Sequence, residues 1–236
     1  MDLTKYEEKY VRIKDIYGNI FTGLARYGNE SFLMAEYGGD EDGLFIEDFL
    51  IYHSQIASIE EIEVHGTVEL RTERLILRRY RPEDAEQLYR YFGTDPEIYR
   101  YSGWNPYATL EMAQETVQKF IDSYDEHVYS WVMDIDDVLV GTIGAYDYAD
   151  GQIEAGFSVN PRWQGRGIAT AALKKVLNYL TENEGISCVT AWCAAENVGS
   201  RKVLEKSGMK LVRMEKDGLA VGEKIYDKLI YEYRDN

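Results

Sequence analysis

Hydrophobic and polar residues alternate in short runs at the start of the chain. Five runs with strand-like composition lie at 10–17, 20–27, 31–37, 43–52 and 55–63. Turn-forming residues separate them, among them Gly18-Asn19, Gly28-Asn29 and Gly38-Gly39-Asp40. The pattern contains no convincing helix between these runs. Five short strands in succession favour a small all-β barrel, because a barrel closes its own sheet edges.

From Thr67 onward, strand-like and helix-like patterns alternate. Helices are predicted after Pro82 and after Thr109, and at 168–183 and 197–207. A three-strand meander with tight turns is predicted over 128–159, and a hairpin closes the chain at 209–233. Single strands are predicted at 75–80 and 187–193. This arrangement predicts an α+β (mixed α/β) domain at 67–236, preceded by the small barrel at 1–66, with His65-Gly66-Thr67 as a short linker.

The charge balance narrows the class of partner. The 236 residues carry a formal net charge of −16, and residues 1–66 alone hold 5 Lys or Arg against 14 Asp or Glu. Nucleic-acid backbones require an excess of Lys and Arg, so this composition argues against DNA or RNA as a partner. An acidic field attracts a cationic substrate such as an amine, although acidity can equally serve solubility alone.

Several absences point to a reducing, cytoplasmic setting. The chain starts with acidic residues instead of a signal-peptide pattern, and no uncharged run is long enough to span a bilayer. Cys188 and Cys193 are five residues apart, so they face opposite sides of a strand and cannot pair within it. We expect two buried free thiols, no metal site and no membrane contact.

The segment 160–170 carries the candidate chemistry. It follows a predicted strand, contains Gly165 and Gly167, and leads into a predicted helix. Glycine lets the backbone approach a ligand closely, and free N–H groups at a helix start bind phosphate. Arg162 and Arg166 add positive charge to an acidic chain. The segment is built like a pyrophosphate cradle, although a plain strand-to-helix turn would use the same two glycines.

Neighbouring motifs favour the cradle. Arg162-x-x-Gly165-x-Gly167 resembles the acetyl-CoA motif of the GNAT superfamily of N-acetyltransferases. Asn197-x-x-Ser200, followed by the run at 203–209, is similar to the family's next motif, and Trp104-x-Pro106 and the opening 72–78 look like its ribosomal-protein acetyltransferase branch. The resemblance covers about 170 residues from Thr67. It implies a central, mostly antiparallel sheet flanked by helices, with acetyl-CoA as co-substrate and an amine as acceptor.

The resemblance also implies roles for individual residues. The backbone of Phe157, Ser158 and Val159 would bind the pantetheine arm as an added strand. The side chain of Asn197 would hold the end of that arm near the thioester, in addition to capping its own helix. Trp104 and Tyr107 lie in the loop that relatives use for substrate. The pyrophosphate would be held by the loop and helix start, which contain Arg162, Gln164, Gly165, Arg166, Gly167 and Ile168.

Catalysis requires a neutral amine, so a base or a proton-conducting water must remove its proton. Glu154 matches a glutamate that relatives often carry on this strand, and it is the first candidate base, with Asp147 in reserve. A cross-strand salt bridge is an equal alternative for Glu154. Strand alternation places Glu154 on the face of Gly156 and Ser158, unless a bulge near Gly156 resets the register. The tyrosine that many relatives use as general acid is replaced by Leu204, so Ser200 or water would supply a proton to the departing thiolate.

Other readings stay open. The missing tyrosine permits an acyl-CoA-binding sensor without turnover. The barrel resembles Sm-like and SH3-like domains in residues 1–66, where an RNA-binding ring is disfavoured by charge and a tethering or oligomerising role, including a homo-oligomer, is preferred. The acceptor can be a small amine or a protein N-terminus, and the sequence does not choose between them.

Overall fold

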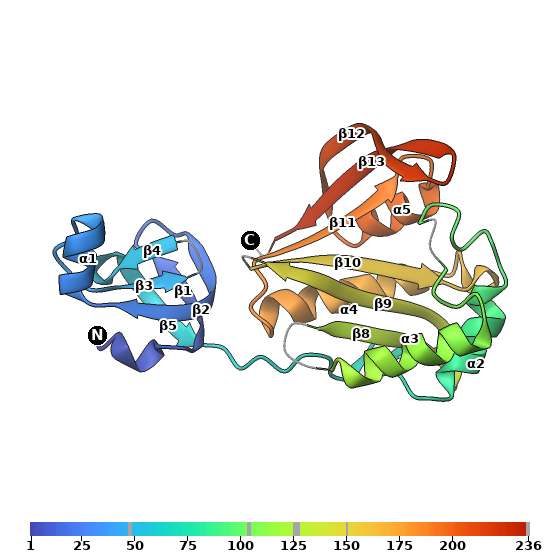
Figure 1. Cartoon of the computed structure of the whole chain (residues 1–236), viewed down its shortest axis with the longest axis horizontal. Helices are drawn as coiled ribbons and strands as arrows, with labels where there is room; N and C mark the ends of the chain where they lie inside the picture. The colour runs from blue at the N-terminus through green and yellow to red at the C-terminus, as the bar shows by residue number, and fades with distance from the viewer. Residues whose placement is uncertain (47–48, 103–104, 125–127, 150, 235–236) are drawn as a thin grey trace.

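Two sheets organise the chain in the computed structural model, which describes residues 1–46, 49–102, 105–124, 128–149 and 151–234 (Figure 1). One sheet has five strands in the order β4-β3-β2-β1-β5, and the other has eight in the order β12-β13-β11-β10-β9-β8-β7-β6. Every paired neighbour in the larger sheet is antiparallel except β10 and β11. The predicted α+β class with a mostly antiparallel sheet is therefore confirmed.

The N-terminal sheet surrounds a small hydrophobic core. Val11 and Ile13 on β1 are fully buried against Leu44 and Ile46 on β3. Closure of this sheet into a barrel stays a prediction, because the strand pairs of the described residues end at β4 and β5. Its elements are η1 (Thr4–Tyr6), β1 (Tyr10–Asp15), β2 (Ile20–Gly28), β3 (Gly43–Ile46), β4 (Phe49–Tyr52), η2 (His53–Gln55) and β5 (Ile56–Glu61).

One predicted strand in this region is wrong. The run at 31–37 forms the helix α1 (Glu30–Tyr37). The side chain of Asn29 accepts a hydrogen bond from the N–H of Phe32 at 2.9 Å, and Gly38 ends the helix in the left-handed conformation with φ of 72°. Asn before a helix and Gly after it are helix boundary signals as well as turn signals, which explains the error. The expected single strand at 43–52 is also two strands, β3 and β4.

The larger sheet contains the predicted meander and the C-terminal hairpin. Its strands are β6 (Leu70–Arg71), β7 (Ile76–Arg78), β8 (Tyr129–Ile135), β9 (Val138–Ala149), β10 (Gln152–Val159), β11 (Cys188–Ala194), β12 (Lys210–Val221) and β13 (Lys224–Tyr233). Asp136 and Asp137 form the β8–β9 turn with φ of 52° and 63°, the left-handed geometry that a two-residue hairpin requires. The two-residue strand β6 was not predicted.

Helices cover both faces of this sheet (Figure 1). On one face, α2 (Asp84–Leu88), the π-helical turn η3 (Tyr89–Gly93) and α3 (Leu110–Asp122) enclose a core with Val132 of β8 and Leu139 of β9. On the other face, α4 (Ile168–Glu182) packs against the central strands, and α5 (Val198–Lys206) lies beside it. The predicted cap Thr109 accepts a hydrogen bond from the N–H of Met112 at 3.2 Å. All four predicted helices after residue 67 are present.

The segment between the two sheets is tied to the larger one. The side chain of Glu184, which is fully buried, accepts hydrogen bonds from the backbone N–H of His65 at 3.0 Å and of Gly66 at 2.9 Å. Thr67 is buried, and its hydroxyl donates to the carbonyl of Val128 at 3.0 Å. The short linker expected at His65-Gly66-Thr67 is thus anchored along its length.

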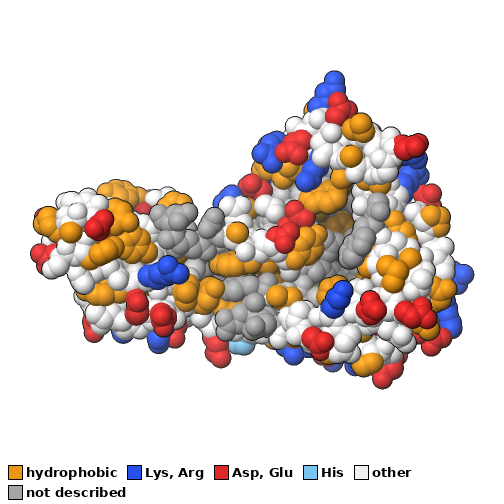
Figure 2. Space-filling model, in the orientation of Figure 1, with side chains coloured by type: hydrophobic (Ala, Val, Ile, Leu, Met, Phe, Trp, Pro, Cys, Tyr) orange, Lys and Arg blue, Asp and Glu red, His pale blue; other side chains and the backbone are white. Residues whose placement is uncertain are grey.

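Charged side chains of both signs are interspersed over the visible face of the larger sheet, whereas hydrophobic side chains gather over the N-terminal sheet (Figure 2). The exposed hydrophobic side chains of residues 1–66 include Phe32, Tyr37 and Phe49. Among the described residues, no helix combines the length and apolar character needed to cross a bilayer.

Candidate active site

An opening forms in the sheet where β10 and β11 stop pairing. The two strands run parallel and pair only from Gln152 to Glu154 on β10, opposite Cys188 to Thr190 on β11. Beyond that point they diverge (Figure 1), while β10 stays paired with β9 as far as Val159. One edge of Phe157, Ser158 and Val159 is therefore without a strand partner in the described structure. A free strand edge can accept an extended ligand as an added strand.

A short loop connects the end of β10 to α4. The side chain of Asn160 is buried and accepts a hydrogen bond from the N–H of Arg162 at 3.0 Å. This bond starts the 3-10 turn η4 (Pro161–Trp163). The side-chain amide of Gln164 donates to the carbonyl of Val159 at 3.0 Å, which fastens the loop to the strand end. The loop is held by its own side chains, while its backbone beyond Gln164 is exposed.

Both glycines of the motif have backbone conformations that other residues rarely adopt. Gly165 has φ of 72° and Gly167 has φ of 78°, and Gly167 immediately precedes the first residue of α4. A methyl group at Gly165 would meet no atom within 4 Å, so this position faces open space. No side chain caps the start of α4, and Ile168 at its first position is buried. The N–H groups of this first turn are available to an anion.

Arginine side chains reinforce this end of the helix. Arg74 donates to the carbonyl of Arg166 at 2.7 Å, and the guanidinium of Arg166 lies 4.8 Å from the centroid of the Trp163 ring. A hollow of about 270 Å³ next to the loop is lined by residues that include Arg90 and Arg162. Arg74, Arg162 and Arg166 therefore lie near this end of the helix, and Asp95 also lines the hollow. The pyrophosphate cradle stays a prediction.

Asn197 and Ser200 lie at the start of α5, which follows β11. The Asn197 side chain accepts a hydrogen bond from the N–H of Ser200 at 3.1 Å. The predicted helix cap is therefore confirmed, while the predicted contact with the pantetheine arm stays a prediction. Leu204 is buried in the core, so its side chain takes no part in an exposed site.

Glu154 lies on the last paired position before the opening. Its neighbours Ile153 and Ala155 are buried against the α4 side of the sheet, so Glu154 faces the other side, as alternation predicts. One carboxylate oxygen, Oε1, accepts a hydrogen bond from the indole Nε1–H of Trp192 on β11 at 2.8 Å. The register of β10 against β9 shifts between Gln152 and Glu154. The sequence had suggested that a bulge could lie further along the strand, near Gly156.

Tyr146 lies opposite Glu154 on the adjacent strand β9. Burial, followed by the negative charge of Glu154, raises the pKa of its phenol. The residue is 44% exposed overall, but its hydroxyl lies over Gly156, where an added methyl group would meet it at 2.8 Å. A larger residue at position 156 would displace this hydroxyl.

Two other predicted residues occupy different surroundings, and a third lies outside the described residues. Asp147, the reserve base, is exposed and has φ of 57° next to the irregular part of the β9–β10 ladder. Tyr107 is buried in the core under α2 and α3, where its ring meets Phe92 edge-on at 6.4 Å between centroids. This placement favours a packing role for Tyr107. Trp104 lies outside the described residues.

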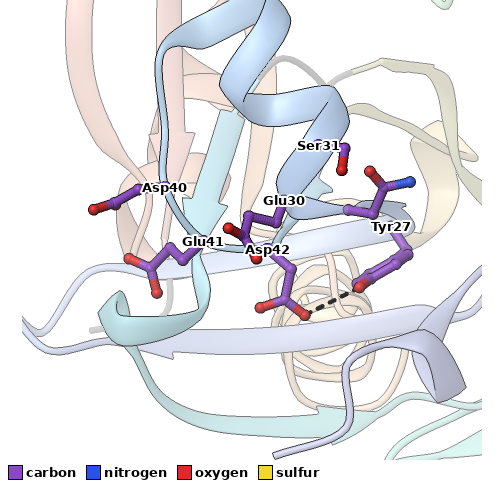
Figure 3. A pocket seen from close by; sticks show the side chains of 7 residues that line it. Tyr27, Glu30, Ser31, Asp40, Glu41 and Asp42 are labelled. Atoms are coloured by element: carbon purple, nitrogen blue, oxygen red, sulfur yellow. Dashed lines mark hydrogen bonds between the residues drawn. The ribbon is translucent and has the colours of Figure 1, made fainter.

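The N-terminal sheet has a separate acidic hollow of about 540 Å³ (Figure 3). The side chains of Glu30, Asp40, Glu41 and Asp42 line it, and the hydroxyl of Tyr27 donates to Asp42 at 3.1 Å. Within the described residues, no group of three His, Cys, Asp or Glu side chains is placed to hold a metal ion.

Sequence reasoning did not identify Tyr146 and Trp192. Alternation within β11 would have placed Trp192 on one face with Thr190. Their proximity to Glu154 depends on the relative register of β9, β10 and β11, and no residue pattern specifies the register of a parallel pair. The sequence pattern therefore predicts on which face of the sheet Trp192 lies, but it does not predict the contact of Trp192 with Glu154.

Comparison with known proteins identifies relatives of the larger sheet and its helices. Residues 74–210 match the family model described as the acetyltransferase (GNAT) domain. The uncharacterized N-acetyltransferase YoaA of Bacillus subtilis is 32% identical over 146 residues, which cover 60% of this chain and 82% of that protein.

Solved structures resemble the same part of the chain. The microcin C7 self-immunity acetyltransferase MccE, in complex with acetyl-CoA and AMP, aligns with a TM-score of 0.64 at 18% identity, over 70% of this chain and 94% of that one. The ribosomal α-N-protein acetyltransferase RimL, in complex with coenzyme A, aligns with a TM-score of 0.64 at 16% identity, over 71% and 98%. At these identities the likeness shows the fold.

Proposed function

The chain belongs to the GNAT acetyltransferase family, and we propose that it transfers the acetyl group of acetyl-CoA directly to a primary amine. One observation carries this proposal: a glycine loop at the start of α4 lies next to the unpaired edge of β10. The two features suit the two ends of coenzyme A, since one offers N–H groups to phosphate and the other offers a strand edge to an amide-containing arm.

The residues present fit acetyl-CoA, whose thioester supplies an activated acetyl group. The N–H groups from Gln164 to Ile168 would bind the pyrophosphate, with Arg162 and Arg166 adding positive charge. The backbone of Phe157, Ser158 and Val159 would pair with the pantetheine arm. Asn197 has its Oδ1 engaged by the N–H of Ser200. Its amide NH₂ remains the group that it would offer to the arm.

We further propose that Glu154 removes the proton of the acceptor ammonium, directly or through one water. The amine nitrogen then attacks the thioester carbon, and the C–S bond breaks with its electron pair on sulfur. The thiolate is a good leaving group, because a thiol has a pKa of about 8.5. Water or Ser200 protonates it afterwards. Glu154 is suited to this role because its carboxylate lies where β10 and β11 separate.

The acceptor is a small amine or the N-terminus of a protein. The formal net charge of −16 favours a cationic acceptor, because a negative field raises the local concentration of ammonium groups. RimL is named as a ribosomal-protein acetyltransferase and MccE as a microcin C7 self-immunity acetyltransferase, so enzymes with different named roles share this fold.

An acetyl-CoA consumption assay over a panel of amines and short peptides with free N-termini tests the proposal. We expect thiol release that depends on one class of acceptor. Tight binding of acetyl-CoA by calorimetry without turnover on any acceptor would support the alternative, an acyl-CoA-binding sensor, which Leu204 at the family's tyrosine position permits.

The role of Glu154 has its own test. Glu154→Gln keeps the shape and removes the charge, so we expect the turnover rate to fall about 100- to 10,000-fold while acetyl-CoA affinity is retained. A variant with normal turnover and lower stability would instead identify Glu154 as a structural residue.

A further inference from the structure

Four side chains form a row across neighbouring strands of the large sheet. The strands β9, β10, β11 and β13 are adjacent, and they carry Tyr146, Glu154, Trp192 and Lys228 respectively. Tyr146 is directly opposite Glu154, which is directly opposite Thr190, two residues before Trp192. Lys228 is opposite Ala194, two residues after Trp192. Since side chains of one face recur every second residue, all four belong to the face away from α4.

Contacts join three members of the row, and the fourth, Tyr146, lies opposite Glu154. The Trp192 Nε1–H donates to the Glu154 Oε1 at 2.8 Å. The ammonium of Lys228 lies 4.8 Å from the centroid of the Trp192 ring. Such a cation over an indole face is attracted by the ring's negative quadrupole. The indole is therefore held on one side by Lys228 while its only donor points at Glu154.

We propose that Trp192 is a positioning residue that holds the Glu154 carboxylate at the opening, and that Lys228 fixes the Trp192 ring. This inference rests on the proposed function, in which Glu154 is the base. A glutamate side chain has several rotatable bonds, and an indole has a single N–H donor on a rigid plane. Donation from that plane selects one carboxylate orientation.

Orientation of the base matters because proton transfer needs its acceptor oxygen within hydrogen-bond reach of the ammonium. Without the indole N–H, the carboxylate would sample other rotamers, and a displacement of about 1 Å can lower the rate about a hundredfold. The pantetheine and pyrophosphate sites lie on other residues, the edge of β10 after Glu154 and the start of α4. Loss of the indole N–H should therefore leave coenzyme binding unchanged.

The test is Trp192→Phe, which keeps an aromatic ring and removes the N–H. We expect kcat to fall about tenfold to a hundredfold, with unchanged affinity for acetyl-CoA by calorimetry. The matched control is Trp131→Phe, because the Trp131 indole donates to the carbonyl of Val68 at 2.7 Å inside the core. That control should lower the melting temperature and retain kcat. A parent-like kcat in folded Trp192→Phe would overturn the proposal.

A double-mutant comparison separates this proposal from the assignment of Glu154. If Trp192 acts through Glu154, Trp192→Phe lowers kcat in the parent and has no further effect in Glu154→Gln. The same fold-loss in both backgrounds would overturn the positioning role and leave the acetyltransferase proposal intact. Full activity of Glu154→Gln alone would overturn both roles, whereas absence of acetyl-CoA binding in the parent would contradict the proposed function itself.

Lys228 provides a second, milder perturbation. Lys228→Arg keeps a cation over the ring and should retain the parent kcat, whereas Lys228→Met removes it and should lower kcat by a smaller factor than Trp192→Phe. This pair also serves if Trp192→Phe proves unstable. Equal kcat values for the two Lys228 variants would remove Lys228 from the proposal.

Discussion

Arg78 is the centre of a buried ionic network that joins three elements. Its guanidinium donates to both carboxylate oxygens of Asp84 on α2 at 2.8 Å, and to Asp134 on β8 at 2.7 Å. The three side chains are 9%, 3% and 6% exposed. Burial acts to lower the pKa of Arg78, but its hydrogen bonds to the two aspartates outweigh burial and raise that pKa, so the guanidinium stays charged. The strand run at 75–80 could be predicted, but this network joins residues that lie far apart in sequence.

Substitution of Arg78 should strongly destabilise the fold. Arg78→Met leaves two aspartates buried without their cation, and breaking such a network typically lowers the unfolding free energy by about 3–5 kcal/mol. The measurement is urea denaturation followed by circular dichroism. The control is Arg90→Met, which removes an exposed pair with Glu86 whose side chains are 64% and 68% exposed. That variant should lose less than about 1 kcal/mol, and equal losses in the two variants would contradict the argument.

The two cysteines should be unreactive in the folded protein. Both are free and buried, and burial raises the pKa of each thiol from 9.0 to about 11. Because the thiolate is the nucleophile, a thiol reagent at pH 8 should label neither residue until the chain unfolds. Their contribution to stability is complete below pH 9.0 and is lost as the pH rises toward about 11. Rapid labelling of two thiols in the folded state would contradict this prediction.

At the scale of elements, the start of α4 carries the most direct test of coenzyme binding. Gly165→Leu places a side chain in open space at the position where a pyrophosphate would approach. We expect acetyl-CoA binding to be lost in calorimetry while the protein stays folded. Gly222→Leu in the β12–β13 turn is the control, because Gly222 also has positive φ, of 59°, and open space around it. Both variants carry similar backbone strain, so unchanged affinity in Gly165→Leu would reject the cradle.

The elements differ in how far sequence alone predicted them. The meander and α4 were predictable because their apolar residues recur at the periods of a strand and of a helix. The helix α1 was not, since Asn29 and Gly38 suit a turn as well as a helix boundary, and only Leu33 of its residues is buried. The opening between β10 and β11 follows from where a parallel ladder ends, which depends on the packing of whole elements. The motif therefore located the candidate coenzyme loop, and the structure located the surroundings of Glu154.

At the scale of the whole molecule, both apolar and polar contacts join the two sheets. The guanidinium of Arg12 on β1 donates to the carbonyl of Thr181 at the end of α4 at 2.8 Å. Cations favour the C-terminal end of a helix, so the N-terminal sheet stabilises the helix whose other end forms the candidate cradle. Glu184, just beyond α4, holds the connecting segment through His65 and Gly66. We propose residues 67–236 as the catalytic domain. His65 and Gly66 help to stabilise this domain through their hydrogen bonds to Glu184.

The hydrogen bonds between Glu184 and the connecting segment determine where a protease can cleave the chain. The side chain of Glu63 is 88% exposed, whereas Gly66 and Thr67 are buried. A protease of broad specificity should therefore cleave next to Glu63 and leave a folded fragment 64–236, instead of cutting within the anchored segment at His65-Gly66. Cleavage first observed between residues 65 and 67 would show that the segment is not held as the Glu184 contacts require.

The two possible fragments should differ in stability. Fragment 64–236 keeps the N–H groups of His65 and Gly66 that donate to Glu184, while fragment 67–236 leaves that buried carboxylate with the hydroxyls of Tyr129 and Tyr179, at 2.8 Å and 2.7 Å. Losing donors to a buried charge should lower the unfolding free energy by about 1–3 kcal/mol. Both fragments need acetylated N-termini, so that no new ammonium group compensates Glu184. Equal urea midpoints would show that the contacts contribute nothing, and two unfolded fragments would make the N-terminal sheet an integral part of the catalytic domain.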